Sequence, residues 1–334
     1  MTGKRITQIF LSVLLVLVMG LTLALTIGCG AGSTLKIGIS QIVTHPALDA
    51  TREGIIDALA EEGYVDGENI MIDYQNSEGD MNLVASIAQK FVSDKYDAII
   101  AIATPNALAA IDAAEGTDIP VIFSAITDPV GSGMVSDWDS HPNENVTGVS
   151  DMIVVQDDVD LIMEIVPDVE KIGTLYNAGE ANSVFLTSKL TEACDDLGII
   201  VVEQTVSTSA DILAAANALV GQVDAIWVGT DNTVVSGLEA LIGVCEDNDI
   251  PFFPADEPSI ERGGIAAYGF DYYDIGVQTG YMVAKVLKAS DSAMSIPVEK
   301  GEIISLSINT AAAERMGITI PQSLVSKAVS TYTK

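Results

Sequence analysis

Positive charge is scarce in this chain of 334 residues. Lysine and arginine together number 15 against 47 aspartates and glutamates, which gives a formal net charge of −32 at pH 7. A nucleic-acid partner requires a basic surface to meet its phosphates, so this composition excludes that class of partner. The acidic surplus is typical of a well-solvated surface, and it disfavours ligands that carry several negative charges.

Histidine and cysteine are also scarce, with two of the former and three of the latter. Two histidines are too few for an evident metal cage, and the chain lacks the G-x-S-x-G, P-loop and C-x-x-C signatures. We therefore expect no catalytic residue, no metal ion and no cofactor. Cys194 and Cys245 fall late in predicted helices on opposite faces of one sheet, which predicts two free, buried thiols.

Charge is absent altogether from the apolar run 9–27, which follows two basic residues and ends just before Cys29. Such a start is typical of a secretory signal, which we place at 1–28. A cysteine after a small residue resembles a bacterial lipobox, which implies that Cys29 carries lipid and begins a tether over 29–34. The alternative is an uncleaved anchor, because the run nears the ~20 residues that span a bilayer. Both interpretations tether the rest of the chain to a membrane, outside the cytoplasm.

Short apolar strands alternate with helical patterns along the rest of the chain, which indicates an α/β fold with parallel sheets. The uninterrupted apolar run at 97–103 is typical of a parallel strand that is buried on both faces. The elements expected are strands at 35–41, 70–74, 97–103 and 120–125, helices at 46–62, 83–92 and from 104, and near the end a helix at 275–287 and a strand at 302–308.

The second half of the chain repeats the plan of the first. Lys-Ile-Gly opens a strand at Lys36 and again at Lys171, and Asp-Ala-Ile opens a buried strand at Asp97 and again at Asp224. The length also suits two units of about 100–200 residues each. We therefore predict two Rossmann-like lobes of one topology, each built on a parallel sheet.

Ligands of open parallel sheets bind beyond the carboxyl ends of the strands, where helix N-termini point outward. The residues at these ends are rich in hydroxyls, amides and carboxylates. The predicted cleft residues are Gln41, Ile42, Thr104, Ala125 and Thr127 in lobe one, and Asn182, Ser183, Asp231, Asp256 and Glu257 in lobe two.

Helix capping is a structural interpretation of several of these side chains. Thr104, Asn182 and Ser183 stand where helices begin, and such residues are favoured at N-caps. Asp231 fits two roles, because a carboxylate there complements the helix dipole or holds a ligand's ammonium group. Two helix N-termini at one cleft, including the one at Thr104, would also suit a carboxylate. These alternatives remain open from the residues alone.

Several short motifs carry a resemblance to a known family. Five of them stand in order: Ile37-Gly-Ile-Ser-Gln41, His45-Pro-Ala-Leu-Asp49, Thr127-Asp-Pro-Val-Gly131, Thr230-Asp-Asn-Thr233 and Tyr268-Gly-Phe-Asp-Tyr272. Together they resemble the ABC transporter substrate-binding proteins of the tryptophan/tyrosine type, from about 35 to 324. Asp256-Glu257-Pro258 departs from the pairs common in that family, at the end of the cleft where a ligand ring would lie.

The resemblance implies a type I periplasmic binding protein, whose two lobes are joined by a multi-strand hinge and close on an amino acid. It implies an aromatic ligand, contacts from the predicted cleft residues, an ABC permease as partner and a lipid-anchored place on the outer face of the cell membrane. Lobe one would comprise 35–149 plus 272–300, and lobe two 150–271 plus 301–334.

Two other functions compete with this interpretation. One is a nucleoside- or sugar-binding lipoprotein or ligand sensor of similar fold, although those proteins commonly stack rings on cleft tryptophans and Trp227 falls in mid-strand. The other is a two-lobed, cofactor-free racemase. That chemistry requires an activated cysteine at a strand end in each lobe, and lobe one has none.

Overall fold

The computed structural model describes residues 34–139, 145–288, 293–302 and 304–334. The predicted signal at 1–28, Cys29 and nearly all of the predicted tether lie outside these ranges. Residues 36–334 form one compact unit, and the fold described below is that of this unit. Within the described ranges, no helix combines the length and the apolar character needed to cross a membrane.

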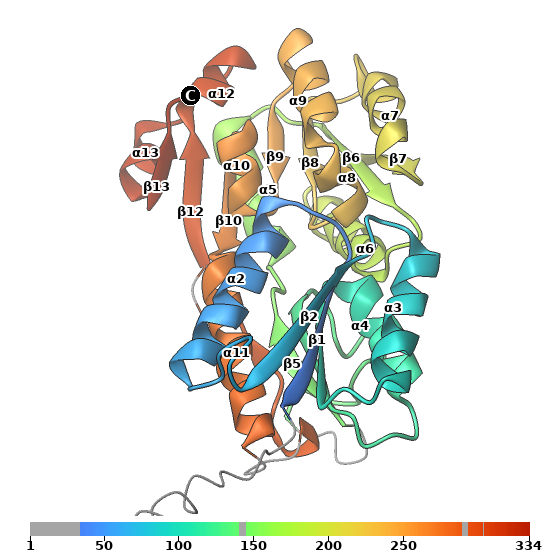
Figure 1. Ribbon diagram of the computed structural model, residues 1–334. Helices are drawn as coiled ribbons and strands as arrows, with labels where there is room; N and C mark the ends of the chain where they lie inside the picture. Colours follow the sequence, from blue (N-terminus) through green and yellow to red (C-terminus); the bar gives the residue numbers. More distant parts are fainter. Residues whose placement is uncertain (1–33, 140–144, 289–292, 303) are drawn as a thin grey trace, which may run out of the picture. The chain divides into compact units, whose positions relative to one another are not determined.

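Two parallel sheets organise the chain, one in each lobe (Figure 1). The first sheet has the order β11-β5-β4-β3-β1-β2, and the second has the order β7-β6-β8-β9. The strands of lobe one are β1 (Leu35–Gln41), β2 (Ile70–Asn76), β3 (Ala98–Ile102), β4 (Val121–Ile126), β5 (Val146–Ser150) and β11 (Glu299–Lys300). Those of lobe two are β6 (Lys171–Asn177), β7 (Ile200–Val206), β8 (Ala225–Val228) and β9 (Phe252–Pro254).

A smaller sheet of order β10-β12-β13 adjoins the second sheet, since Ile265 N donates to Phe252 O at 2.8 Å. Its strands are β10 (Ala266–Phe270), β12 (Ile304–Asn309) and β13 (Ser330–Tyr332). The helices of lobe one are α2 (Pro46–Glu61), α3 (Met81–Ser93), α4 (Thr104–Ala114) and α11 (Tyr272–Leu287). Those of lobe two are α5 (Val155–Ile165), α6 (Ala181–Asp195), α7 (Ile212–Leu219), α8 (Asn232–Ser236), α9 (Leu238–Asp247), α10 (Glu257–Arg262), α12 (Thr310–Arg315) and α13 (Gln322–Lys327). Two short 3₁₀ turns are η1 (Ser209–Asp211) and η2 (Ala293–Ser295).

The predicted α/β fold with two lobes of one topology is confirmed, because the orders β2-β1-β3-β4 and β7-β6-β8-β9 correspond strand for strand. An equivalent hydrogen bond also occurs in both lobes. Asp97 Oδ2 accepts from Lys36 N at 2.7 Å, and Asp224 Oδ2 accepts from Lys171 N at 2.8 Å. Each aspartate precedes the central strand of its lobe and holds the start of the neighbouring strand, so the repeated motif has a repeated structural role.

Several elements extend beyond the ranges expected from the sequence, and one helix and one strand illustrate this. The helix expected at 275–287 begins at Tyr272, because Asp271 caps it and accepts from Tyr273 N and Asp274 N. The strand expected to end at residue 74 continues to Asn76. Caps and strand ends depend on such local bonds, which a hydrophobic pattern does not contain.

Helix α11 returns the chain to lobe one by packing closely against α2 (Figure 1). A Cβ atom on Gly54 would lie 2.2 Å from Tyr273 O, and one on Gly276 would lie 2.1 Å from Thr51 O. Any larger side chain at these positions would therefore force the two helices apart. The close packing that these glycines allow holds α11, which follows β10, against lobe one.

The chain passes between the lobes at three places, and the described residues at these places form a hinge. The chain leaves lobe one after β5, returns between β10 and α11, and leaves again after β11. Tyr272 Oη donates to Asp151 Oδ2 at 2.9 Å, and Gly301 N donates to Ser150 O at 2.9 Å. Each bond joins two of the three crossings, so the crossings form one connected hinge.

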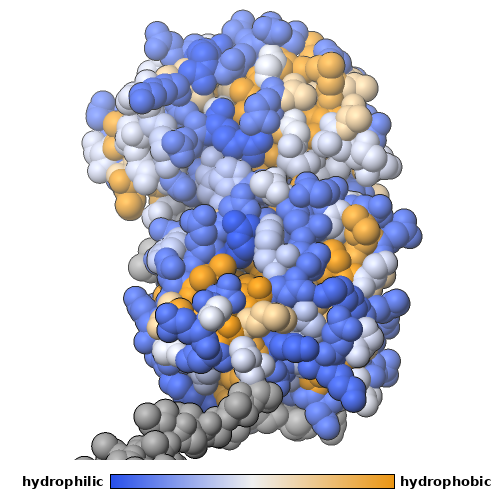
Figure 2. All heavy atoms as spheres, viewed as in Figure 1, coloured by the Kyte–Doolittle hydropathy of each residue, from blue (hydrophilic) through white to orange (hydrophobic). Residues whose placement is uncertain are grey.

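Two expectations from composition agree with the structure. Cys194 and Cys245 are free and buried. Figure 2 shows a face covered mostly by hydrophilic residues with apolar patches between them, as the acidic composition suggests.

A buried carboxyl lies in the core of lobe two. Trp227 on β8 is fully buried, and its Nε1 donates to Asp158 Oδ2 of α5 at 3.1 Å. Burial raises the pKa of Asp158 to about 7, although this bond and one from the Tyr268 backbone favour the ionised form. The folded protein therefore resists ionisation of a group that ionises freely in the unfolded chain.

This shift predicts a pH-dependent effect of Asp158→Asn. The pKa of Asp158 is raised on folding from 3.8 to about 7, so its contribution to stability is fully present below pH 3.8 and is lost as the pH rises towards 7. The melting temperature of Asp158→Asn relative to wild type should therefore increase between about pH 5 and about pH 8. Each 1 kcal/mol corresponds to roughly 2–4 °C in a chain of this size. Thermal unfolding measures it, with Asp160→Asn, at an exposed position of the same helix, as control. A pH-independent difference contradicts it.

Candidate ligand site between the two lobes

Strand ends and helix starts from both lobes enclose a small cavity. Six of the ten predicted cleft residues line it, namely Thr104, Ala125, Thr127, Asn182, Asp231 and Asp256. Across it, the hydroxyl oxygens of Thr127 and Thr230 lie 3.3 Å apart and join the lobes by a hydrogen bond. The cavity measures about 20 Å³, room for about one water molecule. Any larger ligand therefore requires the lobes to move apart before it can enter.

The helix starts around the cavity differ in their capping. The first turns of α8 and α10 are capped by the side chains of Asp231 and Asp256. The longer helices α2, α4 and α6 have no hydrogen bond from an N-cap side chain. Uncapped first turns offer backbone N–H groups and the positive end of the helix dipole to an anion. The cavity wall thus combines uncapped helix ends with capped ones.

The structure changes the capping expected from the sequence. Thr104 was a candidate cap, but it is the first residue of α4, and the N-cap position belongs to Ala103. Asn182 and Ser183 likewise lie inside α6, whose N-cap position belongs to Glu180. Glu180 instead holds α8, because its carboxylate accepts from the backbone N–H groups of two residues there.

Two alanines in the cavity wall have backbone conformations that favour glycine. The φ angles are +74° at Ala103 and +55° at Ala125, and the latter stands at an irregularity in the pairing of β4 with β5. Such conformations cost about 1–3 kcal/mol each and gather at functional sites. Strain at the ends of two adjacent strands is a further sign that this edge of the sheet serves binding.

Two of the cavity carboxylates already have partners within lobe two. Asp231 Oδ2 accepts from Asn177 N at 2.6 Å, and its Oδ1 accepts from Val234 N at 2.8 Å. Asp256 accepts from the backbone N and the hydroxyl of Ser259 at 3.0 and 2.7 Å. Burial raises the pKa of both carboxyls, and at Asp231 the negative charge of Glu180 adds to this. The ammonium role of Asp231 stays a prediction, whereas its contacts are those of a cap.

Asp151 is a third cavity carboxylate, which the sequence reasoning missed. Its Oδ2 accepts from Tyr272 Oη in the hinge, and its Oδ1 lies 3.5 Å from Thr127 Oγ1. Burial raises its pKa to about 6. The strands expected from the sequence do not include β5, so the strand-end rule could not point to the residue that follows it.

His45 and Tyr272 also line the cavity and were missed. His45 holds the N-cap position of α2, and burial lowers its pKa to about 4. His45 could have been found from the sequence, because it begins the motif His45-Pro-Ala-Leu-Asp49, which resembles the family pattern. The position of Tyr272 depends on the return of α11 to lobe one, which no local pattern encodes.

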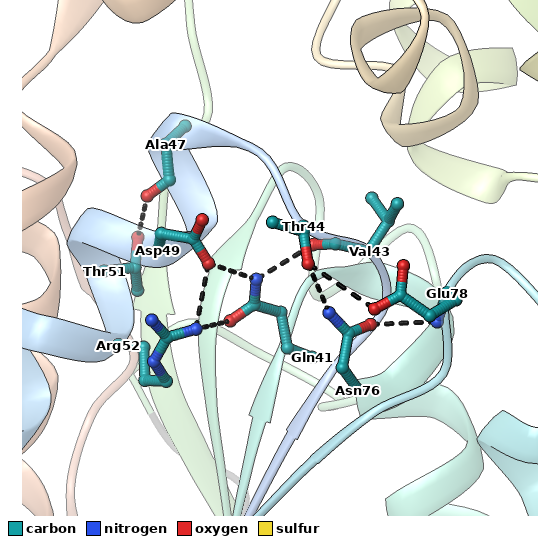
Figure 3. Close-up of polar contacts among 9 residues, drawn as sticks. All are labelled: Gln41, Val43, Thr44, Ala47, Asp49, Thr51, Arg52, Asn76 and Glu78. Atoms are coloured by element: carbon teal, nitrogen blue, oxygen red, sulfur yellow. Dashed lines mark hydrogen bonds and ion pairs between the residues drawn. The ribbon is translucent and has the colours of Figure 1, made fainter.

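Gln41 was predicted to contact ligand, but its side chain does not line the cavity. Its Nε2 donates to Val43 O at 2.8 Å and to Asp49 Oδ1 at 2.9 Å, and its Oε1 accepts from Arg52 Nη1 at 3.0 Å (Figure 3). These contacts fix the loop 42–45, which carries His45. The structure therefore places Gln41 behind the cavity wall.

The other three predicted cleft residues, Ile42, Ser183 and Glu257, are not among the residues that line the cavity. Ile42 borders an adjacent groove of about 320 Å³. Ser183 Oγ accepts from Asn182 Nδ2 at 3.3 Å, and Glu257 accepts a hydrogen bond from Tyr332 Oη. Direct contact of any of the ten residues with a ligand remains a prediction. Among the described residues, no cluster of histidine, cysteine, aspartate or glutamate suits a metal ion.

Comparison with known proteins identifies the family. A model for ABC transporter substrate-binding proteins matches residues 36–332. The chain belongs to this family. Such proteins are extracytoplasmic components of ABC importers, and the named relatives below are binding proteins, which favours that interpretation over the racemase and nucleoside- or sugar-binding alternatives.

This substrate-binding protein is 41% identical over 274 residues to the tyrosine-binding protein of Clostridioides difficile strain R20291, covering 82% of this chain and 78% of the relative. A solved domain from Streptococcus pneumoniae in complex with L-Trp is 37% identical, with a TM-score of 0.85 over 90% of this chain and 100% of that one. A ligand-free, open structure of a substrate-binding protein with adhesive properties from Clostridium difficile has the same identity and coverage.

The two solved structures differ in how well they superpose on this one. The open structure gives a TM-score of 0.66, against 0.85 for the complex with L-Trp. Identity and coverage are equal for the two structures, so the gap reflects the three-dimensional arrangement of the chains. The present structure is thus closer to the ligand-bound neighbour, in agreement with the narrow cavity.

Proposed function

We propose that this substrate-binding protein binds an aromatic amino acid (tryptophan, tyrosine or phenylalanine) between its lobes and delivers it to an ABC permease. Two similar proteins support the ligand class, one named for tyrosine and one solved with L-Trp. The observation that carries the proposal is the narrow cavity between the lobes, to which both lobes contribute polar groups of complementary kinds.

The carboxylate of the ligand is assigned to the uncapped helix starts. No lysine or arginine is among the described residues that line the cavity, so backbone N–H groups, with their partial positive charge, are the available partners for a carboxylate. Thr104 and the first turn of α4 stand at this wall, with the N-termini of α2 and α6 beside them. A carboxylate at a helix N-terminus interacts with both the N–H groups and the dipole.

The ammonium group of the ligand is matched by negative charge in the same cavity. Asp151, Asp231 and Asp256 are all buried there. Their raised pKa values show that burial disfavours the ionised carboxylates, and a bound cation would relieve this. A ligand with a second negative charge, such as glutamate, would be repelled.

Binding is proposed to proceed by closure of the hinge. The moving bodies are lobe one (35–149 plus 272–300) and lobe two (150–271 plus 301–334). The lobes separate to admit the amino acid, and contacts from both lobes then favour the closed form. The permease would recognise that form.

The protein is further proposed to be a lipoprotein. The signal at 1–28 would be removed, Cys29 would carry the lipid, and 29–34 would link it to the folded unit. The charge pattern and the small-residue–cysteine pair support this proposal.

The ligand class is tested by thermal shift with all amino acids, nucleosides and sugars. Tryptophan, tyrosine or phenylalanine should raise the melting temperature, because a ligand at 100 times its Kd adds about 2.7 kcal/mol of stability. Glutamate, sugars and nucleosides should leave it unchanged. A strong shift with a nucleoside alone would overturn the assignment.

The anchor is tested with Cys29→Ala. This variant should accumulate as unprocessed precursor or be shed, and it should incorporate no labelled fatty acid, whereas the wild type should be labelled and remain with the membrane. Cys194→Ala is the control for the loss of a cysteine. An unlabelled wild type that is retained at the membrane would support the uncleaved anchor.

A further inference from the structure

Buried polar atoms without partners point to what the cavity binds. In the part of the chain that the structure describes, six buried side-chain atoms have no hydrogen-bond partner. His45 Nδ1 and Asn182 Oδ1 are the two of these whose residues line the cavity, one from each lobe. Buried polar atoms are almost always satisfied, so this pair requires an explanation.

The Asn182 amide is oriented by its own contacts. Its Nδ2 donates to Thr230 O at 2.8 Å and to Ser183 Oγ at 3.3 Å. The unpartnered atom is therefore the carbonyl oxygen, which only accepts. Asn182 is 3% exposed, so bulk water does not serve this oxygen in the closed form.

The protonation of His45 follows from its neighbour Asn232. Asn232 Nδ2 donates to Glu180 Oε2 at 2.6 Å, which leaves the Asn232 oxygen to accept from the imidazole. Since Nδ1 has no partner, the donor in that contact is Nε2–H. Burial lowers the pKa of His45 to about 4, so the ring is neutral at pH 7 and Nδ1 is a bare acceptor.

Both unpartnered atoms are thus acceptors that require donors from the ligand. The carboxylates of Asp231 and Asp256 differ from them, because both already accept hydrogen bonds from lobe two. An ammonium group has three N–H donors and could serve several acceptors at once. The carboxylate of an amino acid offers no donor, and an aromatic side chain offers one at most, the indole N–H of tryptophan or the phenol O–H of tyrosine, so a side chain alone could not serve both acceptors.

We propose that His45 Nδ1 and Asn182 Oδ1 accept hydrogen bonds from the ligand's ammonium group and so restrict the site to ligands with a free amine. This inference rests on the proposed function and deepens it. One acceptor comes from each lobe, so the ammonium group joins the lobes directly. Asp151 and Asp231 supply the negative charge that balances the ammonium group, while the two neutral acceptors fix its orientation.

The experiment compares L-tryptophan with indolepropionate, its analogue without the amine, by calorimetric titration of the full-length protein. Wild type should prefer L-tryptophan. His45→Gln keeps a polar group near the position of Nε2 but removes the acceptor at Nδ1, so the preference should fall about 10-fold or more. His45→Asn places its amide oxygen near the position of Nδ1 and should retain most of the preference.

A second pair of variants addresses the acceptor from lobe two. Asn182→Ala should lower the preference for L-tryptophan about 10-fold or more, while Asn182→Asp keeps the acceptor and should not. Melting temperatures without ligand show whether each variant is folded. If one fails to fold, the other residue's pair decides the question.

The outcomes separate this inference from the proposed function. A wild type that binds L-tryptophan and indolepropionate equally well overturns the inference alone, as does a preference unchanged in both His45→Gln and Asn182→Ala. In those cases a bound water serves the two acceptors. If wild type binds no aromatic amino acid, the proposed function fails and the inference fails with it.

Discussion

A single geometric constraint determines where this protein can bind anything. A helix follows each of the parallel strands β1, β3, β6 and β8, so the N-termini of α2, α4, α6 and α8 all lie at the carboxyl edges of the sheets. The same arrangement occurs in both lobes. Asp97 and Asp224 accept equivalent hydrogen bonds, so the paired strands have the same register in each lobe. When the hinge brings the two edges together, helix ends surround the space between them. The cavity is therefore a consequence of the repeated topology.

Electrostatics explains how an acidic protein could hold a zwitterion at a cavity whose described lining includes no lysine or arginine. Uncapped helix ends suit a carboxylate, and buried carboxylates suit an ammonium group. Asp151 links the charges of the cavity to the hinge, because it lines the cavity and also accepts a hydrogen bond from Tyr272 in the hinge. A cation bound beside Asp151 would favour its ionised form and strengthen that hydrogen bond. Ligand charge and hinge geometry are thus physically linked.

The sequence predicts most of the fold because buried parallel strands are short apolar runs and their helices begin at recognisable residues. It predicts the site only in part. Thr104, Asn182 and Asp231 are found because a strand end is a local feature. Asp151 is missed because β5 has no clear signal, and Gln41 lies behind the wall because Asp49 and Arg52 hold its side chain. Contacts between segments distant in sequence decide such details.

The central claim is that an aromatic amino acid binds between the lobes and holds them closed. Small-angle X-ray scattering of the protein in solution, with and without saturating L-tryptophan, tests this claim most directly. We expect a smaller radius of gyration with the amino acid, because the free lobes must separate to admit a ligand that a cavity of about 20 Å³ cannot hold. Saturation by L-tryptophan with an unchanged radius of gyration would contradict the account.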